Sequence, residues 1–377
     1  MSEYQFYEFR AIDKPLSKED KAQIGSWSSR TNPTNTGAIF TYNYGNFPKD
    51  EIAVVEKYFD AMFSISNWGT TRLIFKFPKN LLKLDRIKQY STEDGLKIIE
   101  KSDFVILDIE YSEEGGGNWM EGEGWLTSLI SLRDDILNED YRCLYLIWIK
   151  NSIAAIEGGW GNINSDTYEP QVPEQLNELN GALNDFVEIF EIDKDYITVA
   201  VKNSKLNNVV KPIELALYLD RLCENEKQEF LVRLLNDEPF ISIKLKTRLK
   251  DFIDISDIST MEESKRTIGE IMQKVNKIKR ERKNKEKIER EEKQVQKMLK
   301  LEGQEIEIWA EVYRLIAEKN AKGYDGAIKL LKELKDLSIY KNRFSDFCNK
   351  LEMVRTKYSR LSGLTSRIMA AKLIALK

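Results

Sequence analysis

Alternating apolar and polar positions characterise several segments in the first third of the chain. Residues 4–12 and 72–77 alternate well enough to predict β-strands, and residues 38–44 and 104–111 also have strand character. From residue 49 the apolar positions recur every three or four residues instead, which predicts an amphipathic helix. The predicted inner face of this helix is made of Ile52, Val55, Tyr58, Phe59, Met62 and Phe63.

Further signals complete this N-terminal region. Ser17 precedes a polar run and predicts a helix N-cap. Residues 125–137 predict a helix, whereas residues 144–149 (LYLIWI) form a continuous apolar run that fits either a strand or a buried helix. The order of elements predicts an α+β domain over residues 1–157, with a mixed or antiparallel sheet and helices packed against it.

Beyond a connection rich in Gly, Asn and Pro, the pattern is helical to the end of the sequence. A helical domain is predicted over residues 174–258, where Pro212 opens one helix and Pro239 separates the next ones. Its predicted inner face consists of Leu215, Leu219, Leu222, Phe230, Leu234 and Leu235. A long charged helix is predicted over residues 259–302, followed by a C-terminal helical bundle over residues 303–377. The four bundle helices are predicted at residues 306–317, 324–337, 344–358 and 361–376.

The long helix begins with a possible coiled-coil seam. Its apolar a and d positions are Ile268, Ile271, Val275 and Ile278. The following heptads place Arg282, Lys285 and Glu289 in the same seam, so a coiled coil is predicted only for the first part of this helix.

Composition excludes several enzyme classes. The sequence of 377 residues has no histidine, which removes the usual general base, the Ser-His and Cys-His nucleophiles and the commonest metal ligand. Cys143, Cys223 and Cys348 lie far apart in apolar segments and are expected to be buried thiols rather than a disulfide or zinc framework. No cofactor is predicted. The sequence has no recognisable secretory signal and no apolar run of about 18 residues, so a cytoplasmic protein is expected.

The net charge of −4 conceals opposite charges in the two halves of the chain. Residues 1–210 carry 21 basic and 34 acidic side chains, whereas residues 274–377 carry 27 basic and 15 acidic ones. This asymmetry indicates either attraction within the protein or a basic end that binds an anionic partner.

Several segments resemble one widespread bacterial protein family to which no activity is assigned. They include YQFYEFRAIDKPL at 4–16, GEGWLTSLISLRDDILNEDYRCLYLIWI at 122–149 and GYDGAIKLLKELKDL at 323–337. Members of this family are often encoded beside a SWIM-type zinc-finger protein. The resemblance therefore implies a partner or a shared pathway of that kind, and it carries over no catalytic residues.

The basic part of the long helix is the main candidate binding site. Residues 274–300 contain twelve Lys or Arg side chains and five Glu. The residues predicted to bind nucleic acid or an acidic partner are Lys279, Arg280, Arg282, Lys283, Lys285, Lys287 and Arg290. Glu286–Arg290 and Glu289–Lys293 are spaced as i,i+4 ion pairs, so a solvated spacer helix is the alternative interpretation.

Three other groups of residues have both a functional and a simpler structural interpretation. Asp108 and Glu110, two residues apart on a predicted strand, could share Mg²⁺ but equally fit a solvated strand end. The acidic, glycine-rich loop at 112–124 lacks a phosphate-binding motif and fits a surface connection or a protein-binding loop. A base-stacking platform could be built from Tyr4, Phe6, Tyr7, Phe9, Tyr42, Tyr44 and Trp68, although strand aromatics usually lie in a core.

These observations favour a non-enzymatic interaction or adaptor protein. Two alternatives belong to other classes: a nucleic-acid-associated factor that binds through residues 274–300, and a metal-dependent hydrolase that uses Asp108 and Glu110. A protein partner is expected in the first case, with a SWIM-type zinc-finger protein as one candidate.

Overall fold

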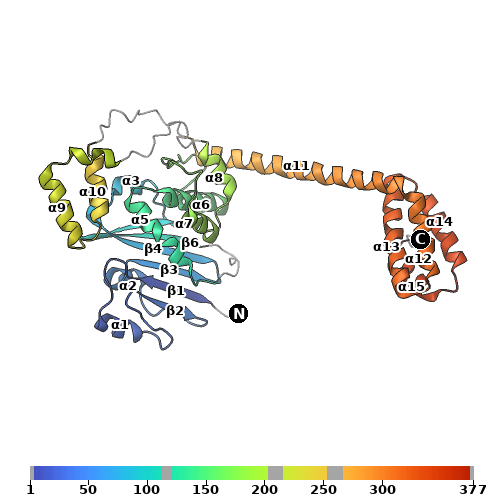
Figure 1. The fold of residues 1–377 in the computed structure, drawn as a ribbon, viewed down its shortest axis with the longest axis horizontal. Helices are drawn as coiled ribbons and strands as arrows, with labels where there is room; N and C mark the ends of the chain where they lie inside the picture. The colour runs from blue at the N-terminus through green and yellow to red at the C-terminus, as the bar shows by residue number, and fades with distance from the viewer. Residues whose placement is uncertain (1–3, 113–120, 203–214, 253–265, 374–377) are drawn as a thin grey trace. The chain divides into compact units, whose positions relative to one another are not determined.

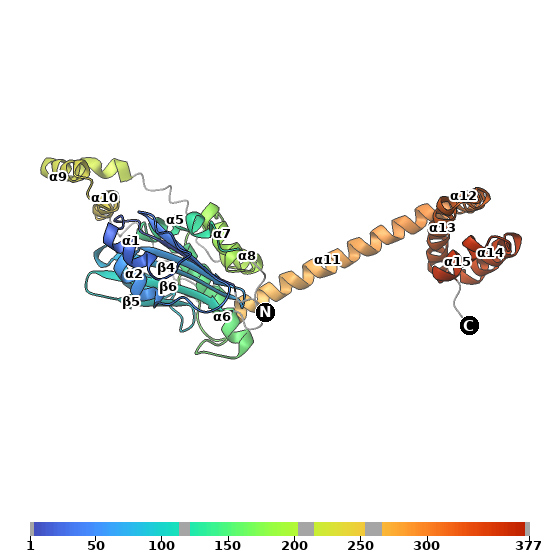
Figure 2. The same ribbon diagram turned by 90° about the horizontal axis from the view of Figure 1, so that it is seen from below.

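The computed structural model describes residues 4–112, 121–202, 215–252 and 266–373 (Figures 1 and 2). The chain divides into two compact units, Met1–Ile278 and Lys279–Lys377. No helix among the described residues is long and apolar enough to cross a membrane.

The first unit is built on a six-stranded sheet with the order β2-β1-β3-β4-β6-β5. Every pairing of neighbouring strands is antiparallel, so the predicted α+β fold is confirmed and its sheet contains no parallel pair among the described strands. The strands are β1 (Gln5–Arg10), β2 (Gly37–Tyr42), β3 (Ala61–Ser66), β4 (Thr70–Pro78), β5 (Leu96–Glu100) and β6 (Phe104–Ser112).

Helices cover both faces of this sheet (Figure 1). Helices α1 (Lys18–Gly25) and α2 (Glu51–Tyr58) lie on one face, above a core that includes Phe9 and Phe40. Ser17 caps α1 as predicted, because its hydroxyl accepts a hydrogen bond from the Asp20 N–H at 3.0 Å. The other face carries α4 (Trp125–Leu129), α5 (Ser131–Leu137), α6 (Arg142–Gly158), α7 (Gly181–Ile189) and α8 (Lys194–Val201).

Two predictions in this unit need correction or resolution. The helix predicted from residue 49 ends at Tyr58, and Met62 and Phe63 lie on β3 with their side chains in the cores on opposite faces of the sheet. A strand that is buried on both faces has no alternation of apolar and polar residues. The apolar residues of β3 therefore looked like a continuation of the helical spacing of α2. Residues 144–149 belong to the buried helix α6 rather than to a strand.

Short elements at the edge of the first unit had weaker sequence signals. The edge strand β5 was not predicted, and the single turns η1 (Lys79–Leu81) and α3 (Leu84–Lys88) precede it. The turn η2 (Leu215–Arg221) leads to α9 (Glu224–Leu235) and α10 (Ile241–Lys250), which Pro239 separates as predicted. Pro212 lies outside the described residues.

The inner face predicted for residues 215–235 is wrong. Of its six members only Leu222 is buried, whereas Leu234 and Leu235 are 56% and 82% exposed. The cysteine prediction is also only partly right, since Cys143 is buried, Cys348 is half-buried and Cys223 is exposed at the start of α9.

The long helix α11 (Ile268–Gly303) is continuous, as predicted for the described part of that range. Ile268, Ile271 and Val275 are fully buried in the core of the first unit, so the predicted coiled-coil seam packs against that core instead. The buried Arg266 precedes the helix and forms two hydrogen bonds with the Glu169 carboxylate, at 2.5 and 2.8 Å. The start of α11 is thereby fixed to the first unit.

The second unit has a hydrophobic core of its own. Four helices form it: α12 (Glu305–Ala317), α13 (Ala321–Tyr340), α14 (Phe344–Lys357) and α15 (Ser362–Ala370). Trp309, Leu331, Leu351 and Leu364 are among its buried residues. Each of the four helices begins and ends within six residues of its predicted bounds, because amphipathic helices with one buried stripe have a clear sequence period.

Candidate functional site

The basic segment of α11 is exposed on all sides. Every residue from Lys279 to Lys297 is exposed, including all seven basic residues predicted to bind an anionic partner. Helices packed in a core have a buried stripe, which this segment lacks. Its side chains are therefore accessible along the whole circumference of the helix.

The charges on this segment are not evenly distributed around the helix axis. Successive residues of an α-helix are rotated by about 100°, which fixes the angular position of each side chain. One sector about 100° wide contains only basic and uncharged residues, and all five glutamates of residues 279–297 fall outside it. We call its basic members the basic stripe: Lys279, Arg280, Lys283, Lys287, Arg290 and Lys297.

Five of the seven predicted residues belong to the basic stripe, whereas Arg282 and Lys285 lie outside it. Lys297 was counted in the basic segment but not singled out, and only its angular position identifies it. A helical projection of the sequence would have found this stripe.

Neighbouring glutamates contact Lys287 only weakly and leave Arg290 and Lys293 without an ion pair within the described residues. Lys287 Nζ lies 3.9 Å from Glu291 Oε1, at the limit of an ion pair. Arg290 and Lys293 form no ion pair within the described residues, so the i,i+4 pairs expected with Glu286 and Glu289 are absent there. The charge of Arg290 on the stripe is thus available to a partner.

The acidic strand pair has a different environment. Asp108 is buried on β6, and both of its carboxylate oxygens accept hydrogen bonds from Arg72 of β4, at 2.7 and 2.8 Å. Glu110 lies 3.6 Å from the same guanidinium, and Glu51 lies 3.4 Å from it. The carboxylates surround an arginine, a partner that the sequence spacing did not reveal because it lies on a neighbouring strand.

Burial and the neighbouring carboxylates have opposite effects on the pKa of Arg72. Burial by itself would lower the pKa of the guanidinium, but the hydrogen bonds and negative charge of Asp108, with Glu110 and Glu51, raise that pKa overall. Arg72 therefore stays protonated and balances the acidic group. Within the described ranges no three His, Cys, Asp or Glu side chains are grouped to hold a metal ion.

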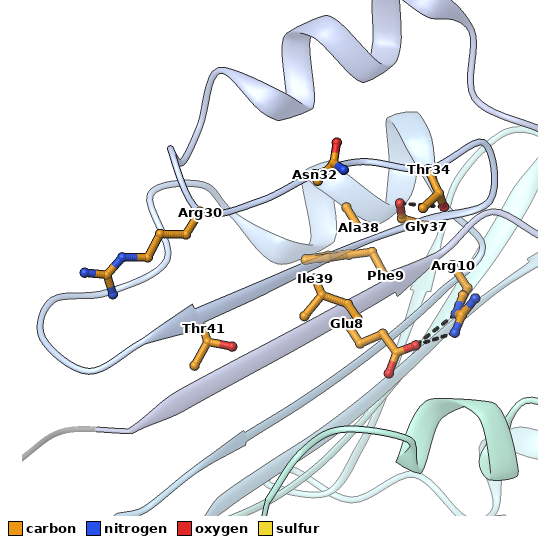
Figure 3. Close-up of a pocket in the computed structure, with 10 residues that line it drawn as sticks. All are labelled: Glu8, Phe9, Arg10, Arg30, Asn32, Thr34, Gly37, Ala38, Ile39 and Thr41. Atoms are coloured by element: carbon orange, nitrogen blue, oxygen red, sulfur yellow. Dashed lines mark hydrogen bonds and ion pairs between the residues drawn. The ribbon is translucent and has the colours of Figure 1, made fainter.

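A pocket lies at the edge of the sheet, between β2 and the loop that precedes it (Figure 3). Its volume is about 460 Å³. Glu8 and Arg10 point toward each other at one end, joined by hydrogen bonds and an ion pair of 2.7 Å, and Arg30 lies at the opposite end. Ile39 contributes an apolar surface between them. The pocket thus has charges of both signs. Its buried acid, Glu8, is paired with Arg10 through Oε1, whereas its Oε2 is buried without a hydrogen-bond partner in the described part of the chain.

The aromatic residues considered for a stacking platform do not share one face of the sheet, and two of them lie in cores, the favoured interpretation of strand aromatics. Phe6 and Phe9 are buried on opposite faces of the sheet, in two different cores. Tyr44 and Trp68 are exposed, at 78% and 42%. Most of the glycine-rich loop lies outside the described residues, although Gly122 packs directly against the Phe6 ring, so that part of the loop contacts the core.

Comparison with known proteins adds no information about this site. No protein-family model matches the chain, and no curated protein or solved structure matches it either.

Proposed function

We propose that the protein is a non-enzymatic adaptor that binds an acidic partner surface through the basic stripe of α11. The observation that carries the proposal is the sorting of charge on an exposed helix: six cations in one sector and no glutamate among them. Opposite charges placed on complementary surfaces steer association and select partners.

A spacer helix would not need this sorting. Solubility and helix stability are both served by glutamate and lysine mixed around the axis, since i,i+4 pairs of opposite charge stabilise a solvated helix. A stripe of like charges instead costs stability through repulsion between residues three and four apart, such as Lys279, Lys283 and Lys287. A partner that neutralises the stripe would offset this repulsion.

The proposed partner is a protein with an acidic surface in the same cytoplasmic compartment. The family resemblance makes a SWIM-type zinc-finger protein one candidate. Each unit of the chain has its own hydrophobic core, which is consistent with a protein that holds partners rather than one that surrounds a substrate.

Nucleic acid is the second candidate partner, and the same stripe favours it. Residues 279–297 span roughly 27 Å at about 1.5 Å per residue, a length over which several phosphates could be contacted. Lysine and arginine on one helix face supply phosphate contacts, and no base-reading module accompanies them, so such binding would lack sequence preference. A hydrolase that uses Asp108 is not favoured, because Arg72 already occupies that carboxylate.

Two labelled polyanions distinguish the two partners. Fluorescence anisotropy is measured with a polyglutamate peptide and with a DNA duplex, each titrated with the full chain at low salt. Binding of polyglutamate at least as tight as that of DNA supports the adaptor. Preferential binding of DNA, with affinity that falls steeply with salt, supports the alternative. If neither probe binds, the basic stripe is not a binding surface.

A further inference from the structure

Helix α9 presents its apolar side to solvent. Leu231, Val232, Leu234 and Leu235 are 59%, 55%, 56% and 82% exposed, and no residue of this twelve-residue helix is buried. At about 100° per residue these four side chains form one continuous face. Both ribbon views place α9 at the periphery of the first unit, beyond α10 (Figures 1 and 2).

The opposite, polar side of α9 is attached to α10 by ion pairs. Glu226 of α9 lies 2.9 Å from Arg248, and Arg233 lies 2.7 Å from Glu238 in the connection. Glu238 also contacts Lys244 of α10 at 2.5 Å. α10 in turn is held to the first unit by Ile243, which is buried in the same core as α6.

These ion pairs fix which way α9 faces. Turning the leucines inward would break the contacts of Glu226 and Arg233 and leave their charges against α10. Exposed apolar clusters of this kind mark interaction surfaces, because removing apolar side chains from water on association is favourable.

We propose that the apolar face of α9 pairs with α9 of a second copy of the chain, in an antiparallel arrangement about a twofold axis. The face is self-complementary in charge. Lys227 lies near one end of it and forms an ion pair of 2.9 Å with the exposed Glu224, a contact that a partner carboxylate would replace or share. Asp237, which has no ion pair within the described residues, follows the other end. An antiparallel pair centred between Leu231 and Leu234 places Lys227 of each copy opposite the 237–238 corner of the other.

A twofold dimer requires only one surface that complements itself, which is why such dimers predominate among homo-oligomers. One helix face is smaller than the roughly 800 Å² per partner of a standard stable interface. The dimer is therefore expected to be weak and to dissociate on dilution. This inference is independent of the basic stripe and does not rest on the adaptor proposal.

Sedimentation equilibrium of the full chain tests the proposal over a wide range of concentrations. The wild type is expected to show a reversible monomer–dimer equilibrium, and the double substitution Leu231→Gln with Leu235→Gln is expected to make it monomeric. Neither leucine is buried in the monomer, so the melting temperature should be nearly unchanged. Leu299→Gln, at a leucine 56% exposed on α11, is the matched control and should leave the dimer intact.

Charge exchange tests the antiparallel register. Lys227→Glu alone should weaken the dimer, and the pair Lys227→Glu with Asp237→Lys should restore it, because the exchange re-forms both contacts across the axis. A wild type that stays monomeric at the highest concentrations overturns the proposal. A dimer that persists in the double leucine variant also overturns it. If the charge exchange fails to restore dimerisation, the antiparallel register is wrong.

Discussion

Buried and half-buried arginines fix the positions of strands and loops in the first unit. Arg72 joins β4 to Asp108 of β6, Arg266 joins the start of α11 to Glu169, and the buried Arg133 binds Asp13 at 2.6 Å. An isolated buried charge is very unfavourable, whereas a pair with good hydrogen-bond geometry is tolerated. The stability of the fold around each of these arginines therefore depends strongly on its carboxylate partner.

Asp108→Asn is expected to destabilise the protein by about 3 kcal/mol, because the largely buried Arg72 guanidinium loses its closest anion and keeps only the more distant Glu51 and Glu110. Chemical denaturation measures the change. Glu110→Gln is the control, since this more exposed carboxylate lies 3.6 Å from Arg72 and should contribute below about 1 kcal/mol. Stabilisation of the wild type by Mg²⁺ that disappears in Asp108→Asn would instead favour a metal site.

Two helices, α9 and α11, have packing environments that differ from those expected from their sequence patterns. α11 buries its first apolar residues in a core and leaves the rest exposed, and α9 faces solvent with its leucines. A hydrophobic period identifies a helix and its apolar stripe, but it does not specify what that stripe contacts. The seam at Ile268–Ile278 and the supposed inner face at Leu234 and Leu235 were misassigned for this reason.

Docking of α11 can be tested with two matched substitutions. Ile271→Ala removes a fully buried side chain and is expected to cost about 2–5 kcal/mol of unfolding free energy. Ile288→Ala, at an isoleucine 54% exposed on the same helix, should change stability by less than about 0.5 kcal/mol. Alanine favours the helix at both sites, so propensity cannot explain a difference. Equal effects in denaturation experiments would contradict the docking.

The attachment of α9 to α10 should depend on pH. Hydrogen bonds from Arg233 and then Lys244 lower the pKa of Glu238 from 4.5 to about 2. Because the pKa is lower in the folded protein, this stabilisation is fully present above pH 4.5 and is lost as the pH falls toward 2. Amide hydrogen exchange should show loss of protection in α9 over that window. In Glu238→Gln the protection of α9 should be reduced already at neutral pH and should change less on acidification.

For the molecule as a whole, local sequence patterns predicted the order of helices and strands better than the residues against which they pack. The α+β fold, the continuous helix and the four C-terminal helices followed from periodicity and capping, which are local. The pairing of Arg72 with Asp108 and the burial of Ile271 depend on neighbours distant in sequence, which no spacing rule identifies. The basic stripe could be predicted in part from the sequence, because its position follows once residues 279–297 are known to form one uninterrupted helix.

We propose that the basic stripe, rather than the total charge of the helix, binds an anionic partner. The most direct test compares two variants of equal net charge: Lys283→Gln, Lys287→Gln and Arg290→Gln on the stripe, and Arg282→Gln, Lys285→Gln and Lys293→Gln outside it. Their affinities for labelled polyglutamate are measured by anisotropy as a function of salt. The stripe variant is expected to lose at least about tenfold in affinity, or about 1.4 kcal/mol, while the control variant stays within about threefold of the wild type. Equal losses in the two variants would contradict the account.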